Sequence, residues 1–144
     1  MPQSDAPLHW PGMLKSLDHV NIRTHQLGGL TSFYCDVLGM TTGPRPSFSF
    51  GGAWIYCAGR PVVHLVLVPA ERELTPPSPD LQLQHFAFFG SDLSAFLERL
   101  RHHNVAYQIG KLLDMQLCQV HLHDPDGNPI HIDFPLAEAE QAQV

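Results

Sequence analysis

Hydrophobic and polar residues alternate along several short segments of the chain. Between these segments lie stretches in which apolar residues recur at the spacing of a helix. Residues 16–24 change character at every second position, which predicts a strand with two different faces. A helix is predicted next, ending at Gly39, from the apolar residues Leu30, Phe33, Tyr34, Val37 and Leu38. Segments 52–58 and 62–68 predict two further strands, with a short extra strand near 40–42. The first half is therefore one β-α-β-β unit.

The second half of the chain has the same order of elements. Residues 83–89 predict a strand, and Ser91 or Asp92 can cap the helix that follows. That helix is indicated by apolar residues at helical spacing, namely Leu93, Phe96, Leu97 and Leu100. Residues 117–134 predict a strand, a tight turn containing Pro and Gly, and a final strand. The two halves therefore look like copies of one unit.

The spacing of the histidines supports an internal duplication. His19 and His85 are 66 residues apart, and His64 and His131 are 67 apart. The helices match at an offset of 63, because the first strand-to-helix turn is longer. At the offset of 67, Trp54 and Tyr56 fall opposite His121 and His123. The predicted organisation is one domain over 1–144, with a first module at about 14–69, a proline-containing linker at about 70–82, a second module at about 83–135 and a polar tail at 136–144.

Composition narrows the possible partners. The formal charge is −6 and Lys and Arg number only 8, so no basic face is available to bind nucleic acid. No apolar run approaches the roughly 18 residues of a membrane span. Three cysteines and a start without a signal-peptide pattern predict a soluble protein in the reducing cytoplasm.

Four of the ten histidines occupy the repeated positions, namely His19, His64, His85 and His131. Two curved sheets related by a pseudo-twofold axis would bring equivalent inward residues together, so we expect these four rings to converge. Neutral imidazole binds divalent transition metals such as Zn, Ni, Fe or Co. Packed core histidines are the alternative explanation, and the matched spacing favours the metal site. His121 and His123 share one strand face and are interpreted as structural.

Five motifs resemble the glyoxalase, bleomycin resistance and dioxygenase superfamily, also called the vicinal oxygen chelate superfamily. They are LDHVNI (17–22), FYCDVLGM (33–40), VVHLV (62–66), QHFAF (84–88) and DPDGNPIHIDF (124–134). The resemblance implies an α+β fold of two β-α-β-β-β modules forming a cup-shaped mixed sheet around a central metal. It places His19, His64, His85 and His131 in the ligand positions.

The resemblance also implies an activity and an assembly. Members of the family commonly bind a small substrate whose adjacent oxygens chelate the metal, which suggests lyase or isomerase chemistry. The last ligand is usually Glu, and in glyoxalase I that carboxylate moves substrate protons, whereas this chain has His131 there. His131 and, two residues later, Asp133 are therefore the candidate catalytic residues. Single-length chains of the family often pair, so a homodimer is expected.

Two other functions stay open at this point. An Fe(II)-dependent extradiol-type dioxygenase would use His19, His85 and His131 and leave positions for oxygen and substrate. A metal-free drug-binding protein of the bleomycin-resistance type would instead line the cleft between halves with aromatic residues such as Trp54, Tyr56 and Phe48.

Overall fold

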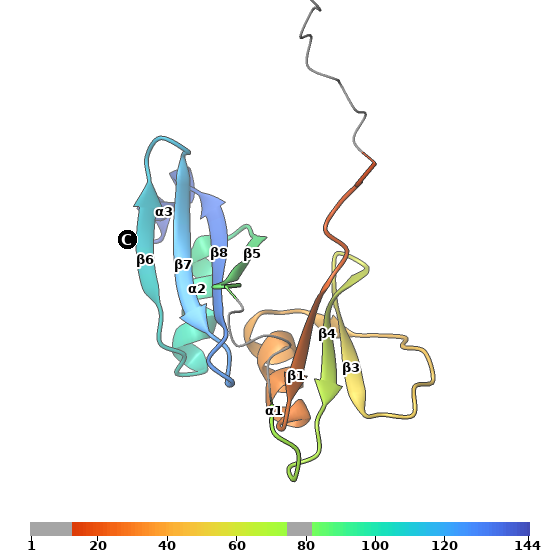
Figure 1. Cartoon of the computed structure of the whole chain (residues 1–144). Helices are drawn as coiled ribbons and strands as arrows, with labels where there is room; N and C mark the ends of the chain where they lie inside the picture. Colours follow the sequence, from red (N-terminus) through yellow and green to blue (C-terminus); the bar gives the residue numbers. More distant parts are fainter. Residues whose placement is uncertain (1–12, 75–81) are drawn as a thin grey trace, which may run out of the picture.

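The computed structural model describes residues 13–74 and 82–144, and it contains two modules with the same order of elements (Figure 1). The linker prolines Pro76, Pro77 and Pro79 lie outside the described residues. The first module consists of β1 (Val20–Thr24), α1 (Leu27–Ser32), the short π-helical turn η1 (Phe33–Val37), β2 (Thr41–Thr42), β3 (Gly52–Cys57) and β4 (Arg60–Leu67). The second consists of β5 (Phe86–Phe89), α2 (Leu93–His102), β6 (Gln108–Leu112), β7 (Leu117–His123) and β8 (Pro129–Pro135), followed by α3 (Ala137–Gln141).

Each module forms a four-stranded mixed sheet, in the orders β1-β4-β3-β2 and β5-β8-β7-β6. The first strand of each module lies at a sheet edge and runs parallel to the last strand of that module. The other neighbouring strands are antiparallel. This is the predicted α+β fold of two β-α-β-β-β modules.

Strand register confirms the duplication residue by residue. Trp54 lies opposite His64 in the first sheet, and His121 lies opposite His131 in the second. In the parallel pairs, Asn21 lies opposite His64 and Ala87 opposite His131. The histidines separated by 66 and 67 residues therefore belong to equivalent structural positions.

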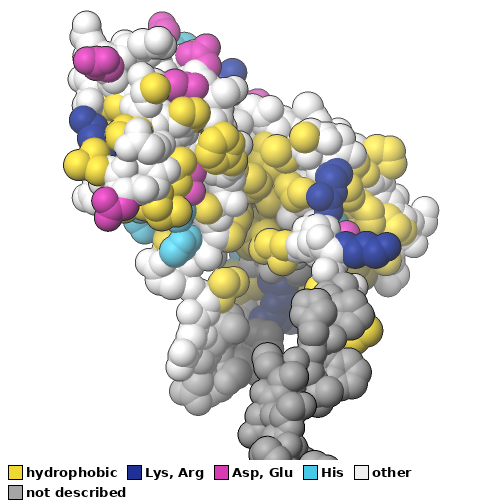
Figure 2. Space-filling model, turned by 90° about the horizontal axis from the view of Figure 1, so that it is seen from above, with side chains coloured by type: hydrophobic (Ala, Val, Ile, Leu, Met, Phe, Trp, Pro, Cys, Tyr) yellow, Lys and Arg dark blue, Asp and Glu magenta, His cyan; other side chains and the backbone are white. Residues whose placement is uncertain are grey.

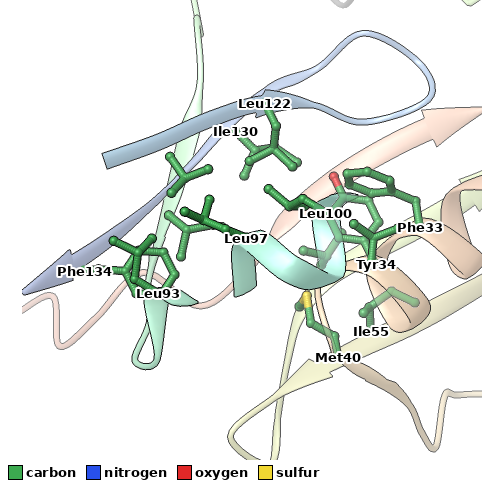
Figure 3. Close-up of a cluster of buried hydrophobic side chains, with 14 of the residues drawn as sticks. Phe33, Tyr34, Met40, Ile55, Leu93, Leu97, Leu100, Leu122, Ile130 and Phe134 are labelled. Carbon is green, nitrogen blue, oxygen red and sulfur yellow. The ribbon is translucent and has the colours of Figure 1, made fainter. Parts of the chain in front are cut away.

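The alternating strands place apolar residues on one face of each sheet, where the helices cover them. Figure 3 shows part of this core, in which Leu93, Leu97 and Leu100 of α2 lie beside residues of β7 and β8. All three leucines are fully or almost fully buried. The same core continues into the first module, through Phe33 and Tyr34 of η1, Met40 after it and Ile55 of β3.

A buried hydrogen bond ties the two modules together on this helical side. The Tyr34 hydroxyl donates to Asp124 Oδ2 at 2.9 Å, and burial raises the pKa of the Tyr34 phenol far above its ordinary value. Asp124 also accepts bonds from the backbone N–H groups of Asp126 and Asn128 and from the Asn128 amide. Because all these donors are satisfied by one carboxylate, the turn at 124–128 is fixed against the first module.

Several element boundaries differ from the sequence-based prediction. β1 and β5 begin one residue after His19 and His85, at the first paired residues of their ladders with β4 and β8, Val20 opposite Val63 and Phe86 opposite Ile130. The first helix starts earlier, at Leu27, and finishes in a π-helical turn closed by Gly39 at φ 75°. Asp92 caps α2, as expected, by accepting from the Ala95 N–H at 3.1 Å.

Two elements have bounds that the sequence pattern did not predict, although the family resemblance implied a third strand after the helix of the second module. β6 (Gln108–Leu112) completes the second sheet, and α3 (Ala137–Gln141) forms within the segment expected to be a polar tail. Ala139 buries itself against the core, and Glu138 accepts a bond from the Leu93 N–H, so α3 packs on the start of α2. Among the described residues, no helix is long and apolar enough to cross a membrane.

Candidate metal site

The four predicted ligands all lie on the sheet faces turned away from the helical core. In the first sheet, Val63 and Leu65 point into the core, so His64 between them points to the open face. In the second sheet, Ile130 and Ile132 are buried, and His131 between them also points outward. The shared orientation of the equivalent histidines agrees with the predicted duplication.

The first pair of histidines forms an aromatic stack on the open face of sheet one. His64 lies between the His19 ring, at a centroid distance of 3.8 Å, and the Trp54 ring, at 4.1 Å. Both contacts are close to parallel, with interplanar angles of 14° and 8°. His64 is buried, and this burial, followed by the charge of His19, lowers its pKa. The ring is therefore neutral near pH 7, the form that binds metal.

The second pair lies in a more polar environment. His85 and His131 have ring centroids 4.5 Å apart. His131 Nδ1 donates to Asp133 Oδ1 at 2.8 Å, and the same oxygen accepts from the Gln119 side-chain amide at 2.9 Å. Asp133 is thus held between a histidine and an amide on neighbouring strands, where it orients the imidazole.

Each of the four predicted ligands has one ring nitrogen bonded to an oxygen acceptor. His19 Nδ1 donates to Asp18 Oδ2 at 2.7 Å, and His64 Nε2 donates to the Pro61 carbonyl at 3.0 Å. His85 Nδ1 bonds the Gln84 side-chain oxygen, and His131 bonds Asp133 as described above. Since an acceptor fixes the proton on one nitrogen, the other nitrogen keeps a lone pair. This is the arrangement usual for histidines that bind metals, so the residues fit a divalent ion.

The structure brings these histidines together as two pairs, not as one group of four. Within residues 13–74 and 82–144, no three His, Cys, Asp or Glu side chains are arranged to hold a metal ion. His19 and His85 line opposite sides of one hollow of about 720 Å³ between the two modules. Figure 2 shows hydrophobic side chains on the two lobes that flank this region. The edge strands β1 and β5 face the hollow without pairing to each other.

The aromatic residues predicted to line a drug-binding cleft have other contacts. Trp54 stacks on His64, and the Tyr56 hydroxyl donates to the Pro44 carbonyl at 2.6 Å. Phe48 stacks on Phe50 at 4.9 Å, with the Arg45 guanidinium over both rings. The described walls of the hollow between the modules include none of these three predicted residues.

His121 is a member of the histidine cluster that sequence reasoning set aside as structural. Its ring centroid is 5.1 Å from that of His131, and partial desolvation by neighbouring side chains, followed by the charge of His131, lowers its pKa. It shares a hollow of about 420 Å³ with His85 and His131. The duplication could have revealed it, because His121 occupies the position of Trp54, directly opposite a predicted ligand.

Comparison with known proteins identifies the family. Residues 16–132 match the model of the Glyoxalase/Bleomycin resistance protein/Dioxygenase superfamily. The chain belongs to this superfamily. It is 31% identical over 132 residues to "Glyoxylase I 4" of Arabidopsis thaliana, an alignment that covers 88% of this chain and 72% of the relative.

Solved structures show the same fold. A glyoxalase family protein from Bacillus anthracis aligns with a TM-score of 0.70 and 20% identity, covering 88% of this superfamily member and 99% of that chain. TnmS3, an antibiotic binding protein from Streptomyces, aligns with a TM-score of 0.64 and 21% identity, and the alignment covers 87% of this chain and 99% of TnmS3. Similarity at this level supports the fold, and the function has to be argued from the site.

Proposed function

We propose that this superfamily member is a metal-dependent enzyme in which His19, His64, His85 and His131 bind one divalent transition metal, such as Zn, Ni, Fe or Co. The observation that carries this proposal is the hydrogen bonding of the four rings. Each has an acceptor on one nitrogen and a lone pair on the other. Such an acceptor on one nitrogen is usual for histidines that bind a metal, because it fixes the tautomer and the orientation of the ring.

The substrate class follows from the ligand set. Bound to four neutral imidazoles, the metal would act as a Lewis acid toward a small molecule with two adjacent oxygens and would stabilise the negative charge that develops on them. The hollow beside His19 and His85 has apolar walls, including Val20, Val62 and Phe86, which would exclude water from the apolar part of such a molecule. We infer lyase or isomerase chemistry on this class of substrate.

Asp133 acts mainly as a positioning residue in this proposal. One of its carboxylate oxygens accepts from both His131 and Gln119, so it directs the lone pair of His131 Nε2 toward the metal. His131 replaces the Glu usual in glyoxalase I and, as a ligand, has no free nitrogen with which to take a proton. The chain therefore lacks the usual proton-moving carboxylate at the ligand position.

The separation of the two pairs within one chain supports a homodimer as the active form. The edge strands β1 and β5 have unpaired backbone groups, and the exposed Leu17 and Leu83 lie just before them. A second copy that contributes its β5 edge to β1 would cover both edges and place one pair from each chain together. Each dimer would then contain two metal sites, each composed of two chains.

Metal analysis of mixed variants tests both parts of the proposal. Purified wild-type protein should contain about one transition metal per chain. The double variants His19→Ala/His64→Ala and His85→Ala/His131→Ala should each bind metal at least about a hundredfold more weakly. Mixing the two in equal amounts after mild unfolding should restore tight binding at about a quarter of the wild-type stoichiometry, because about half of the reassembled dimers are mixed and one of the two sites in each mixed dimer is complete.

Different results would separate the alternatives. A wild-type protein that takes up no Zn, Ni, Fe or Co would overturn the metal-dependent function and favour a binding protein. Metal binding without restoration on mixing would contradict the shared site and leave the metal function in place. Activation by ferrous iron alone, with oxygen consumption on a catechol, would support the dioxygenase function through His19, His85 and His131.

A further inference from the structure

The open face of the second sheet has four histidines, where the equivalent positions of the first module have two histidines, a tryptophan and a tyrosine; three of the four, His85, His121 and His131, have rings close to one another. His121 in β7 lies directly opposite His131 in β8, and His85 immediately precedes β5 on the other side of β8. The three rings therefore come from three neighbouring segments of one sheet. They all line the same hollow on its open face.

The spacing of these rings suits a common metal ion. Metal-to-nitrogen bonds of about 2.0–2.1 Å at octahedral to tetrahedral angles place neighbouring imidazole centroids roughly 4.5–5.2 Å apart. The observed centroid distances are 4.5 Å between His85 and His131 and 5.1 Å between His121 and His131. These two distances lie within that range, but the three side chains are not arranged to hold a metal as they stand, so binding would require the rings to rotate until one nitrogen of each meets at a common point.

The hydrogen bonds of the cluster leave that rotation possible. His131 is oriented by Asp133, whose negative charge would also offset part of the charge of a cation. His121 has no hydrogen bond to the described residues and is exposed, so its ring can turn without breaking a bond. In the first module the equivalent position holds Trp54, an indole without a free lone pair for a metal.

We propose that His121 is an additional metal ligand and that His85, His121 and His131 together bind a divalent transition cation such as Zn or Co without help from the first module. This inference rests on the proposed function, because His85 and His131 belong to the shared site. It adds an asymmetry that the shared site alone does not imply. The second module anchors the metal, and the first module completes its coordination.

The test compares cobalt and zinc affinities of the full-length metal-free protein and its variants. His121→Ala should weaken binding at least about tenfold relative to wild type. The comparison variant is His123→Ala, a histidine that lines the same hollow but lies opposite Pro129 instead of His131, and it should weaken binding much less than His121→Ala. His121→Gln provides a second variant, and circular dichroism with urea denaturation confirms that each protein is folded.

The two double variants reveal the asymmetry directly. His19→Ala/His64→Ala should still bind one cobalt weakly, with an absorption spectrum of a nitrogen-coordinated ion, and adding His121→Ala should abolish it. His85→Ala/His131→Ala should bind none. Equal affinities of the His121 and His123 variants, or equal loss in the two double variants, would overturn the role of His121 and leave the shared site standing. A wild-type protein that binds no metal would overturn both proposals.

Discussion

The open faces of the two sheets have the same backbone and different chemistry. Equivalent positions are occupied by Gly52, Trp54, His64 and Val66 in the first module and by Gln119, His121, His131 and Asp133 in the second. His64 is held by stacking between two rings and by a backbone carbonyl. His131 is held by a carboxylate that is itself held by an amide.

This comparison shows how a duplicated fold can specialise. The strand register that places a histidine in the first module places one in the second, so duplication alone accounts for the two pairs. Ring stacking fixes a side chain through contact area, whereas a carboxylate adds charge and sets the tautomer. We therefore expect the first module to contribute shape to the site and the second to contribute most of the metal affinity.

The largest expected effect is on glyoxalase I activity, and it comes from replacing His131 on the open face of the second sheet. Wild-type protein should show weak or no glyoxalase I activity on the hemithioacetal of methylglyoxal and glutathione, since the proton-moving carboxylate is missing. His131→Glu supplies a carboxylate at that position, and a positioned general base contributes about 10²–10⁴-fold to a rate. The activity should therefore rise by up to that factor, measured as formation of the thioester product.

A matched carboxylate opposite Pro129, instead of at a proposed ligand position, controls this experiment. His123→Glu places the same group on an exposed position of the neighbouring strand and should leave the activity at the wild-type level. Wild-type turnover comparable to that of authentic glyoxalase I would refute the prediction. Another residue, with Asp133 first in line, would then have to serve as the base.

A smaller effect is expected when the orienting charge beside His131 is removed. Asp133→Asn keeps an oxygen acceptor for His131 Nδ1 but lacks the negative charge. Losing such a supporting carboxylate typically weakens metal binding about 10–100-fold. Val66→Ala, at the equivalent position of the first sheet, should change the affinity little. Equal zinc affinities of wild type and Asp133→Asn, measured by chelator competition, would show that the carboxylate has no orienting role.

The repeated parts of the fold were predictable from sequence because the pattern occurs twice. Matching the two halves located β1, β3, β4, β5, β7 and β8 and both principal helices. β6 was missed because Gln108, Gly110 and Lys111 give little strand signal, and pairing with β7 decides its structure. Likewise, α3 forms because Ala139 and Glu138 pack on α2, a contact that no local pattern contains.

The sequence predicted which histidines occupy equivalent positions on the open faces, and it did not predict how these histidines are arranged in space. The spacing identified the four histidines, and their common face follows from strand alternation. Their separation into two pairs depends on how the modules pack through Tyr34, Asp124 and the helical core, which involves residues 90 positions apart. His121 was set aside because its importance depends on the β7–β8 register, which places it opposite His131.

The smallest expected effect is a change in the free energy of unfolding, which compares the ring stacking on the first sheet with the polar contacts on the second. Trp54→Ala removes the ring that covers His64 and should reduce the free energy of unfolding by about 1–3 kcal/mol, measured by urea denaturation at pH 8. His121 occupies the equivalent position of the second sheet and is exposed, so His121→Ala should reduce the free energy of unfolding by less than about 0.5 kcal/mol. Trp54→Ala would then lower the stability of the protein more than His121→Ala does. The proposed effect on metal affinity has the opposite order, because only His121 is proposed to be a ligand.

Trp54→Ala should also change how the free energy of unfolding depends on pH. Because burial lowers the pKa of His64 in the folded protein, the unfolded chain binds the proton more readily, and this histidine makes the fold less stable as pH falls below about 6.5. In Trp54→Ala the ring is less buried, so its pKa should move back toward the ordinary value and this loss of stability at low pH should shrink. An NMR titration of the His64 ring proton checks the shift in the metal-free protein. An unchanged His64 pKa in Trp54→Ala would mean that His19 and the sheet, not the indole, bury the ring.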